Sequence, residues 1–168
     1  MSEATASKPG QRRVITLERR YRASLEDVWR LWTTKEGIES WWGPDGFAVT
    51  VDHLDLRAGG ELRYTMAAVA PEMIEFMQQD GMLVETSLTL VFTEVESLRR
   101  LSYTALADFI PHIEPYEMAT TVSLEQEGGE VRMVLAFDAM HDEAWTERAV
   151  LGYENELERM AKLLQSAA

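Results

Sequence analysis

The fold is decided by the stretch Val131-Arg-Met-Val-Leu-Ala-Phe-Asp-Ala-Met140 and by the uninterrupted helical run that follows it from Asp142 to Gln165. The first stretch alternates in the manner of a strand with one buried face. The second carries a stripe at helical spacing that is predicted to be buried, namely Trp145, Ala149, Tyr153, Leu157, Met160 and Leu164. Its other face is predicted to lie in water, with Glu143, Glu147, Arg148, Glu154, Glu158 and Arg159. A long terminal helix after a series of strands indicates one sheet wrapped around that helix, an arrangement that tends to leave a cavity.

The rest of the chain supplies the strands that such a sheet needs. A first strand is predicted over residues 14–21, and two short helices follow it, the first opened by the capping box Ser24-Leu-Glu-Asp27 and the second over about 36–41. Three hairpins then follow, pairing 47–56 with 61–68, 83–94 with 98–106, and 117–126 with 130–140. Sequential hairpins form antiparallel sheets. The predicted class is therefore α+β, with a curved antiparallel sheet of about seven strands.

One segment interrupts this series of hairpins. Residues 71–81 begin with Pro71, which suits a first helical turn, and end at Gly81, which suits a helix cap. We therefore predict an inserted amphipathic helix whose Met73, Ile74, Phe76 and Met77 need a surface to pack on. A lid over a cavity mouth and simple protection of the sheet edge are equally good interpretations.

Length and composition limit the classes of function. The 168 residues fit one domain, predicted over 13–168, after a polar tail over 1–12. Lys and Arg total 16 against 29 Asp and Glu, and the resulting net charge of −13 disfavours nucleic-acid and membrane-surface partners. The N-terminus lacks the apolar core of a secretion signal, and no apolar run is long enough to span a membrane, so we expect a cytoplasmic protein.

No motif for metal, cofactor or nucleophilic chemistry is present. The chain has no cysteine, no paired-histidine spacing and no glycine-rich phosphate loop, so we predict no metal site and no cofactor. His141 is interpreted as part of a helix cap with Asp142 rather than as a catalytic group. The weak catalytic candidates are His112, Glu114 and Glu117, which with Asp108 cluster around one predicted loop between strands, and a solvated surface explains these acidic residues better. Whether the protein is an enzyme stays open, and the sequence favours a non-enzyme.

Several motifs together resemble a known family. They are Ala23-Ser-Leu-Glu-Asp-Val-Trp29, Trp41-Trp-Gly-Pro-Asp-Gly-Phe47, Asp55-Leu-Arg-Ala-Gly-Gly60 and Met140-His-Asp-Glu-Ala-Trp145, which runs into Gly152-Tyr153-Glu154. The chain resembles the helix-grip fold of the START-like (SRPBCC) superfamily, and within it the bacterial stand-alone members of the activator of heat-shock-protein-ninety ATPase homologue-like family. The resemblance implies an apolar pocket between sheet and terminal helix for lipids, polyketides or other hydrophobic molecules. The inserted 71–81 segment departs from the compact connection usual in the family.

Aromatic and methionine residues are the candidate lining of that pocket, because such pockets combine apolar walls with a few donors. The predicted ligand-binding residues are Trp42, Phe47, Tyr64, Met66, Met73, Phe76, Met77, Tyr103, Met118, Trp145 and Tyr153. The leading hypothesis is a protein that binds a small hydrophobic ligand of lipid, polyketide or aromatic type. The alternatives are a cyclase- or dehydratase-like enzyme that uses the same cavity, and a co-chaperone-like protein-interaction module. Homodimerisation stays open.

Overall fold

The computed structural model describes residues 13–43, 46–108, 110 and 112–166. The predicted tail at 1–12 therefore lies outside the described residues. In chain order the elements are β1 (Val14–Tyr21), α1 (Leu25–Thr33), α2 (Lys35–Trp41), β2 (Phe47–Leu54), β3 (Glu61–Ala68), α3 (Pro71–Gln79), β4 (Glu85–Glu96), β5 (Arg100–Ala107), β6 (Tyr116–Glu127), β7 (Glu130–Asp138) and α4 (Glu143–Ser166). The predicted α+β class and element order are confirmed, with boundaries that differ by a few residues.

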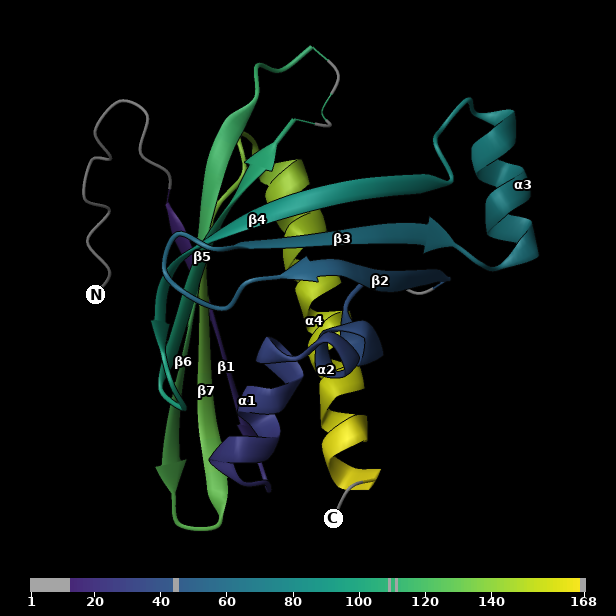
Figure 1. The fold of residues 1–168 in the computed structure, drawn as a ribbon. Helices are drawn as coiled ribbons and strands as arrows, with labels where there is room; N and C mark the ends of the chain where they lie inside the picture. Colours follow the sequence, from purple (N-terminus) through teal and green to yellow (C-terminus); the bar gives the residue numbers. More distant parts are fainter. Residues whose placement is uncertain (1–12, 44–45, 109, 111, 167–168) are drawn as a thin grey trace.

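All seven strands join one antiparallel sheet in the order β1-β7-β6-β5-β4-β3-β2. The three predicted hairpins pair as neighbours, and the first strand pairs with β7, so that the first and last strands of the chain lie side by side at one edge of the sheet. Register shifts between Val51 and His53 and between Phe92 and Glu94 add irregularities that bend strands. The sheet curves around α4, which crosses it along one face (Figure 1).

The core lies between this face and α4. Met133 and Leu135 of β7 and Leu157 and Met160 of α4 are each at most 1% exposed. The alternation along β7 places every second side chain in this core, as the 131–140 pattern predicts. The two short helices pack beside α4 and complete the layer, with Trp32 of α1 also buried.

Local signals in the sequence explain the helix boundaries. The Ser24 side chain accepts a hydrogen bond from the backbone N–H of Asp27 at 3.1 Å, which satisfies a donor at the start of α1. Asp142 caps α4 in the same way, because its Oδ1 accepts from the Trp145 N–H at 2.8 Å. His141 instead shares a 3.1 Å hydrogen bond between its Nδ1 and the Tyr116 hydroxyl. The capping prediction is therefore right for Asp142.

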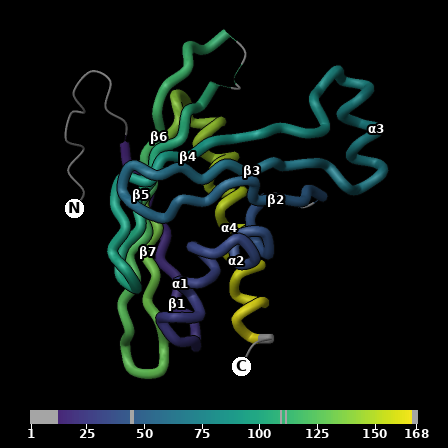
Figure 2. The backbone as a smooth tube through the Cα atoms, viewed as in Figure 1, coloured from purple at the N-terminus to yellow at the C-terminus, as the bar shows by residue number. Residues whose placement is uncertain are grey.

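The inserted helix is present as α3, and Gly81 follows it with a φ of 72°. The Met82 N–H returns to the Met77 carbonyl at 2.8 Å, which closes the end of the helix as the glycine predicts. The strands β3 and β4 carry α3 away from the body of the protein (Figures 1 and 2).

Candidate functional site

Aromatic side chains from five separate elements converge on the face of the sheet that α4 covers. The Trp42 ring, at the end of α2, meets the Tyr64 ring of β3 edge-on at 5.2 Å between centroids. The Trp42 ring also lies 6.3 Å from that of Tyr103 on β5. The Tyr153 ring of α4 lies 4.5 Å from that of Phe137 on β7, with the two planes tilted by 37°. We call Trp42, Tyr64, Tyr103, Tyr153 and the carboxyl of Glu156 the interior cluster.

The three tyrosine hydroxyls of the interior cluster stay protonated. Burial raises the pKa of Tyr64, Tyr103 and Tyr153, and the nearby Glu156 carboxylate raises it further by disfavouring a second negative charge. The Tyr153 side chain lies close enough to the Tyr103 and Thr120 side chains for both to affect its pKa. The cluster therefore presents neutral hydroxyl groups within an apolar surrounding.

Glu156 lies one turn after Tyr153 on α4, and its Oε2 accepts a hydrogen bond from the Gly43 N–H at 2.7 Å. Burial raises the pKa of this carboxyl to about 7, although the hydrogen bond from Gly43 and the nearby Arg159 guanidinium both oppose the shift. Arg159 also donates from Nη2 to the Gly43 carbonyl. Side chains of α4 therefore bind both the N–H and the carbonyl of Gly43.

Three members of the interior cluster combine deep burial with residual solvent-accessible surface. Tyr64, Tyr153 and Glu156 lie deep enough that desolvation is the largest cause of their raised pKa. Each nevertheless keeps part of its surface and is half-buried rather than fully buried. Side chains surrounded by protein that still have free surface are typical of the lining of an internal space.

Trp42 contributes an unused donor. Its indole Nε1 is buried without a hydrogen-bond partner among the described residues. The indole groups of Trp32 and Trp41 are satisfied, by the Met133 sulfur at 3.3 Å and the Leu31 carbonyl at 2.7 Å respectively. Buried polar groups are nearly always paired, so an unpaired donor beside a half-buried wall marks a position where a ligand or water could accept.

The structure brings together only part of the predicted ligand-binding set. Trp42, Tyr64, Tyr103 and Tyr153 meet in the interior cluster. Phe47 and Met66 lie next to it, since a Cβ built on Gly43 would stand 3.9 Å from an atom of each.

The other predicted lining residues lie elsewhere. Met118 and Trp145 pack in a separate small core with Ala107, Ile110 and Met140. Met73, Phe76 and Met77 belong to α3, where Phe76 is 58% exposed. These five residues were grouped with the others by type, and residue type alone does not report which element a side chain faces.

The catalytic candidates His112, Glu114 and Glu117 are all exposed. His112 and Glu114 precede β6 and Glu117 is its second residue, and the exposure of the two acidic residues agrees with their solvated interpretation. His112 has a φ of 64°, which reflects the turn in the backbone there.

Sequence reasoning missed Glu156 and placed Arg159 on the wrong face. Arg159 was predicted to lie in water, but it is half-buried and binds the Gly43 carbonyl. Both residues follow Tyr153 at intervals of three, so they flank the apolar stripe rather than oppose it. That position on the helix is the one signal that could have found them.

No set of three or more His, Cys, Asp or Glu side chains within the described ranges is placed to hold a metal ion. A surface pocket of about 360 Å³ lies at the start of α4, lined by Arg13, Ala139, Met140, His141, Asp142, Glu143 and Thr146. It is separate from the interior cluster and is mostly polar.

Among the described helices none has the length and apolarity to cross a bilayer.

Solved structures with the same fold share almost the whole length of the chain. A protein from Chromobacterium violaceum aligns with a TM-score of 0.74 at 23% identity, covering 94% of this chain and 98% of the other. An AHSA1-like protein from Aeromonas hydrophila aligns with a TM-score of 0.71 at 22% identity, covering 92% and 94%. An AHSA1 protein from Silicibacter pomeroyi gives 0.71 at 19% identity, covering 93% and 100%. These similarities establish the helix-grip fold.

No curated protein sequence matches the chain. The family model described as activator of Hsp90 ATPase homolog 1-like protein matches residues 22–165, from the start of the first helix region to the end of α4. The chain therefore belongs to the activator of Hsp90 ATPase homolog 1-like protein family.

Proposed function

We propose that this protein binds a small hydrophobic molecule in the space between the sheet and α4. The observation that carries the proposal is the interior cluster, whose side chains are desolvated and yet keep free surface. Apolar pockets with a few fixed polar groups are the usual form of a small-molecule site. The family fits either a ligand-binding or a co-chaperone-like domain, and the interior cluster favours the first.

The polar groups of the cluster also limit the ligand. The Trp42 indole can only donate a hydrogen bond, so it requires an acceptor atom on the ligand. The tyrosine hydroxyls can donate or accept, and the Glu156 carboxyl carries a negative charge above about pH 7. A second carboxylate beside Glu156 would be repelled. The ligand is therefore expected to be largely apolar and uncharged, with at least one acceptor.

Two measurements test the proposal. Native mass spectrometry of freshly purified protein should detect a co-purifying small molecule. Binding of the neutral fluorescent probe Nile red, which carries a carbonyl acceptor, should be weakened at least several-fold by Trp42→Phe, because the substitution removes the indole donor. The matched control is Trp29→Phe, since Trp29 lies outside the interior cluster. The proposal fails if the wild-type protein does not bind the probe, or if the two substitutions change binding equally.

One observation favours a second function, proton transfer within the same cluster. A carboxyl with a pKa near neutrality inside an apolar site can both accept and donate a proton, as general acid–base catalysis requires. Glu156 has this property, whereas His112, Glu114 and Glu117 are exposed. An enzyme of this type should lose turnover in Glu156→Gln while still binding its substrate. Turnover that persists in that variant would exclude the role.

A further inference from the structure

We propose that the segment formed by residues 69–85, which we call the arm, is a docking surface for a basic amphipathic segment of another protein. This inference does not depend on the interior cluster. It rests on the exposure of the apolar side chains of the arm, on its charge, and on the sparse packing of its helix α3 against the other described elements.

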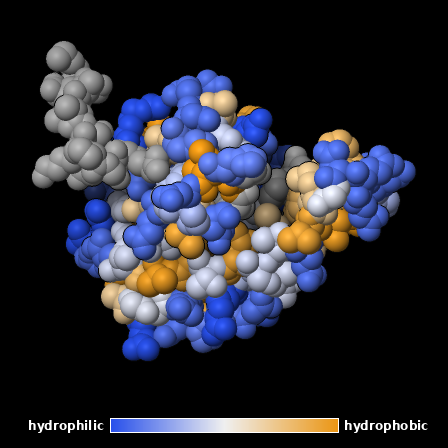
Figure 3. All heavy atoms as spheres, turned by 90° about the horizontal axis from the view of Figure 1, so that it is seen from above, coloured by the Kyte–Doolittle hydropathy of each residue, from blue (hydrophilic) through white to orange (hydrophobic). Residues whose placement is uncertain are grey.

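Apolar side chains are unusually exposed on the arm. Ten large hydrophobic residues of the described chain are exposed, and four of them fall within 69–83. These are Val69 at 57%, Phe76 at 58%, Met82 at 51% and Leu83 at 75% exposed. Figure 3 shows hydrophobic side chains gathered on the projecting part of the molecule, next to hydrophilic ones. Contiguous exposed apolar surface of this kind marks interaction sites in soluble proteins.

The helix of the arm has little packing against the rest of the protein, although the Val69 N–H donates to the Gly46 carbonyl at 2.8 Å where the arm begins. The nine-residue helix α3 makes no extensive contact with another described helix or strand, and its N-terminus has no side-chain cap. A helix of this length is marginal in water without tertiary packing. Only Met77 of α3 is buried. Contact with a partner would supply the packing that the body of the protein does not.

The negative charge of the arm indicates a partner with positive charge. Residues 64–98 contain no Lys, Arg or His, whereas Glu72, Glu75, Asp80 and Glu85 of the arm are all exposed. None of these four carboxylates forms an ion pair with another described residue, and Glu75 only meets the neighbouring Gln79 amide at 3.4 Å.

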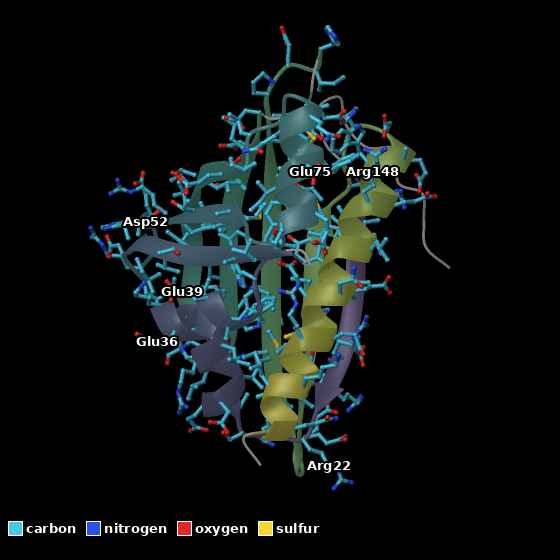
Figure 4. All side chains as sticks on the ribbon, turned by 90° about the vertical axis from the view of Figure 1, so that its right-hand side faces the viewer. Arg22, Glu36, Glu39, Asp52, Glu75 and Arg148 are labelled. Carbon is cyan, nitrogen blue, oxygen red and sulfur yellow. The ribbon has the colours of Figure 1, made fainter. Side chains whose placement is uncertain are left out.

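The apparent closeness of Arg148 to the arm in one view results from the viewing direction. Arg148 of α4 lies beside Glu75 in Figure 4, but Figure 1 shows α3 and α4 well apart. The negative field of the arm is therefore not neutralised from within the described part of the molecule.

An apolar patch bordered by uncompensated carboxylates is complementary to a helix with apolar anchors and Lys or Arg at its edges. A second copy of this chain would instead bring four carboxylates against four, and anionic lipid headgroups would be repelled in the same way. The methionines of the arm, at 73, 77 and 82, can repack around side chains of different shape.

The test uses a synthetic amphipathic helix composed only of Leu and Lys, labelled with a fluorophore, and its counterpart in which every Lys is Glu. Fluorescence anisotropy should show binding of the Lys peptide, with an affinity that falls as salt rises, and no binding of the Glu peptide. Phe76→Ser combined with Leu83→Ser should weaken binding about tenfold or more. Leu106→Ser combined with Leu151→Ser, which alters exposed apolar residues elsewhere, should leave it unchanged.

A matched pair of charge variants separates the arm from the general acidity of the protein. Glu72→Lys with Glu75→Lys should weaken binding, whereas Glu147→Lys with Glu158→Lys on the exposed face of α4 should have a much smaller effect. Equal effects of the two pairs, or of the two apolar pairs, would overturn the proposal. So would self-association of the wild-type protein that Phe76→Ser abolishes, because the arm would then pair with a second copy.

Discussion

The carboxyl of Glu156 should make the stability of this protein fall as pH rises through neutrality. Its pKa in the folded state is about 7, against an ordinary value of 4.5, so the folded state holds a proton that the unfolded state has released. Between these two values the unfolded chain binds fewer protons than the folded one, and linkage then requires the free energy of unfolding to decrease with pH. The stabilisation is complete below pH 4.5 and is lost as pH rises through 7.

The size of the effect follows from the two pKa values. Integration of the linkage relation gives a loss of about 2.5 kcal/mol between pH 5 and pH 8 from this one group. Glu156→Gln keeps an oxygen that can accept from the Gly43 N–H but removes the titration. The variant should therefore lack this part of the pH dependence and should gain about 2.5 kcal/mol relative to the wild-type protein over that range.

Urea unfolding at 25 °C, followed by tryptophan fluorescence at pH 5, 6, 7 and 8, measures the difference directly. The many other carboxyl groups titrate in both proteins. The informative quantity is therefore the free energy of unfolding of Glu156→Gln minus that of the wild-type protein, and the change of this difference with pH. Glu158→Gln is the control, because Glu158 is exposed on the same helix. If Glu156→Gln follows the wild-type curve within about 0.5 kcal/mol at all four values of pH, the burial of this carboxyl is refuted.

Three substitutions and one control substitution test other parts of the structure, each by urea or thermal unfolding. A Cβ on Gly60 would lie 2.1 Å from the Asp55 carbonyl oxygen, so Gly60→Ala should cost about 2 kcal/mol or more, while Gly129→Ala, with nothing within 4 Å, should be nearly neutral. Leu157→Ala should cost about 3 kcal/mol, because the side chain is 1% exposed in the core. Ser24→Ala should cost about 1 kcal/mol through the lost helix cap. A cost below about 0.5 kcal/mol for Gly60→Ala, Leu157→Ala or Ser24→Ala would contradict the contacts described.

Elements with a regular pattern could be predicted from the sequence alone. The alternation over 131–140 and the stripe from Trp145 to Leu164 are long and strongly periodic, and they correspond to β7 and α4. The glycines at 59–60 and 128–129 mark hairpin turns because a positive φ is needed there, and Gly59 and Gly128 adopt it. Where the pattern was weaker, as at the beginning of β4, the boundary moved by two residues.

The site was predicted less completely because it depends on distances between elements. Trp42, Tyr64, Tyr103 and Tyr153 were found by residue type, since aromatic residues are suited to line an apolar space. The same criterion also selected Trp145 and Phe76, which the fold places in a second core and on the arm. Periodicity reports the side of an element that is buried, but it does not report the element that lies opposite.

Glu156 shows that a charged residue next to the apolar stripe of α4 can belong to the interior cluster rather than to the solvated face. A charged residue three positions after Tyr153 looks like part of the solvated face, because the stripe itself already satisfies the apolar requirement. Gly43, two residues after the end of α2, however, lies against α4 at this point and presents its N–H to Glu156 and its carbonyl to Arg159. These two contacts fix the residue next to Trp42, and so they position the indole against the Tyr64 ring. The two charged side chains that sequence analysis did not assign to the site thus hold the aromatic residue that it did assign, and a change at either should alter ligand affinity through the position of Trp42.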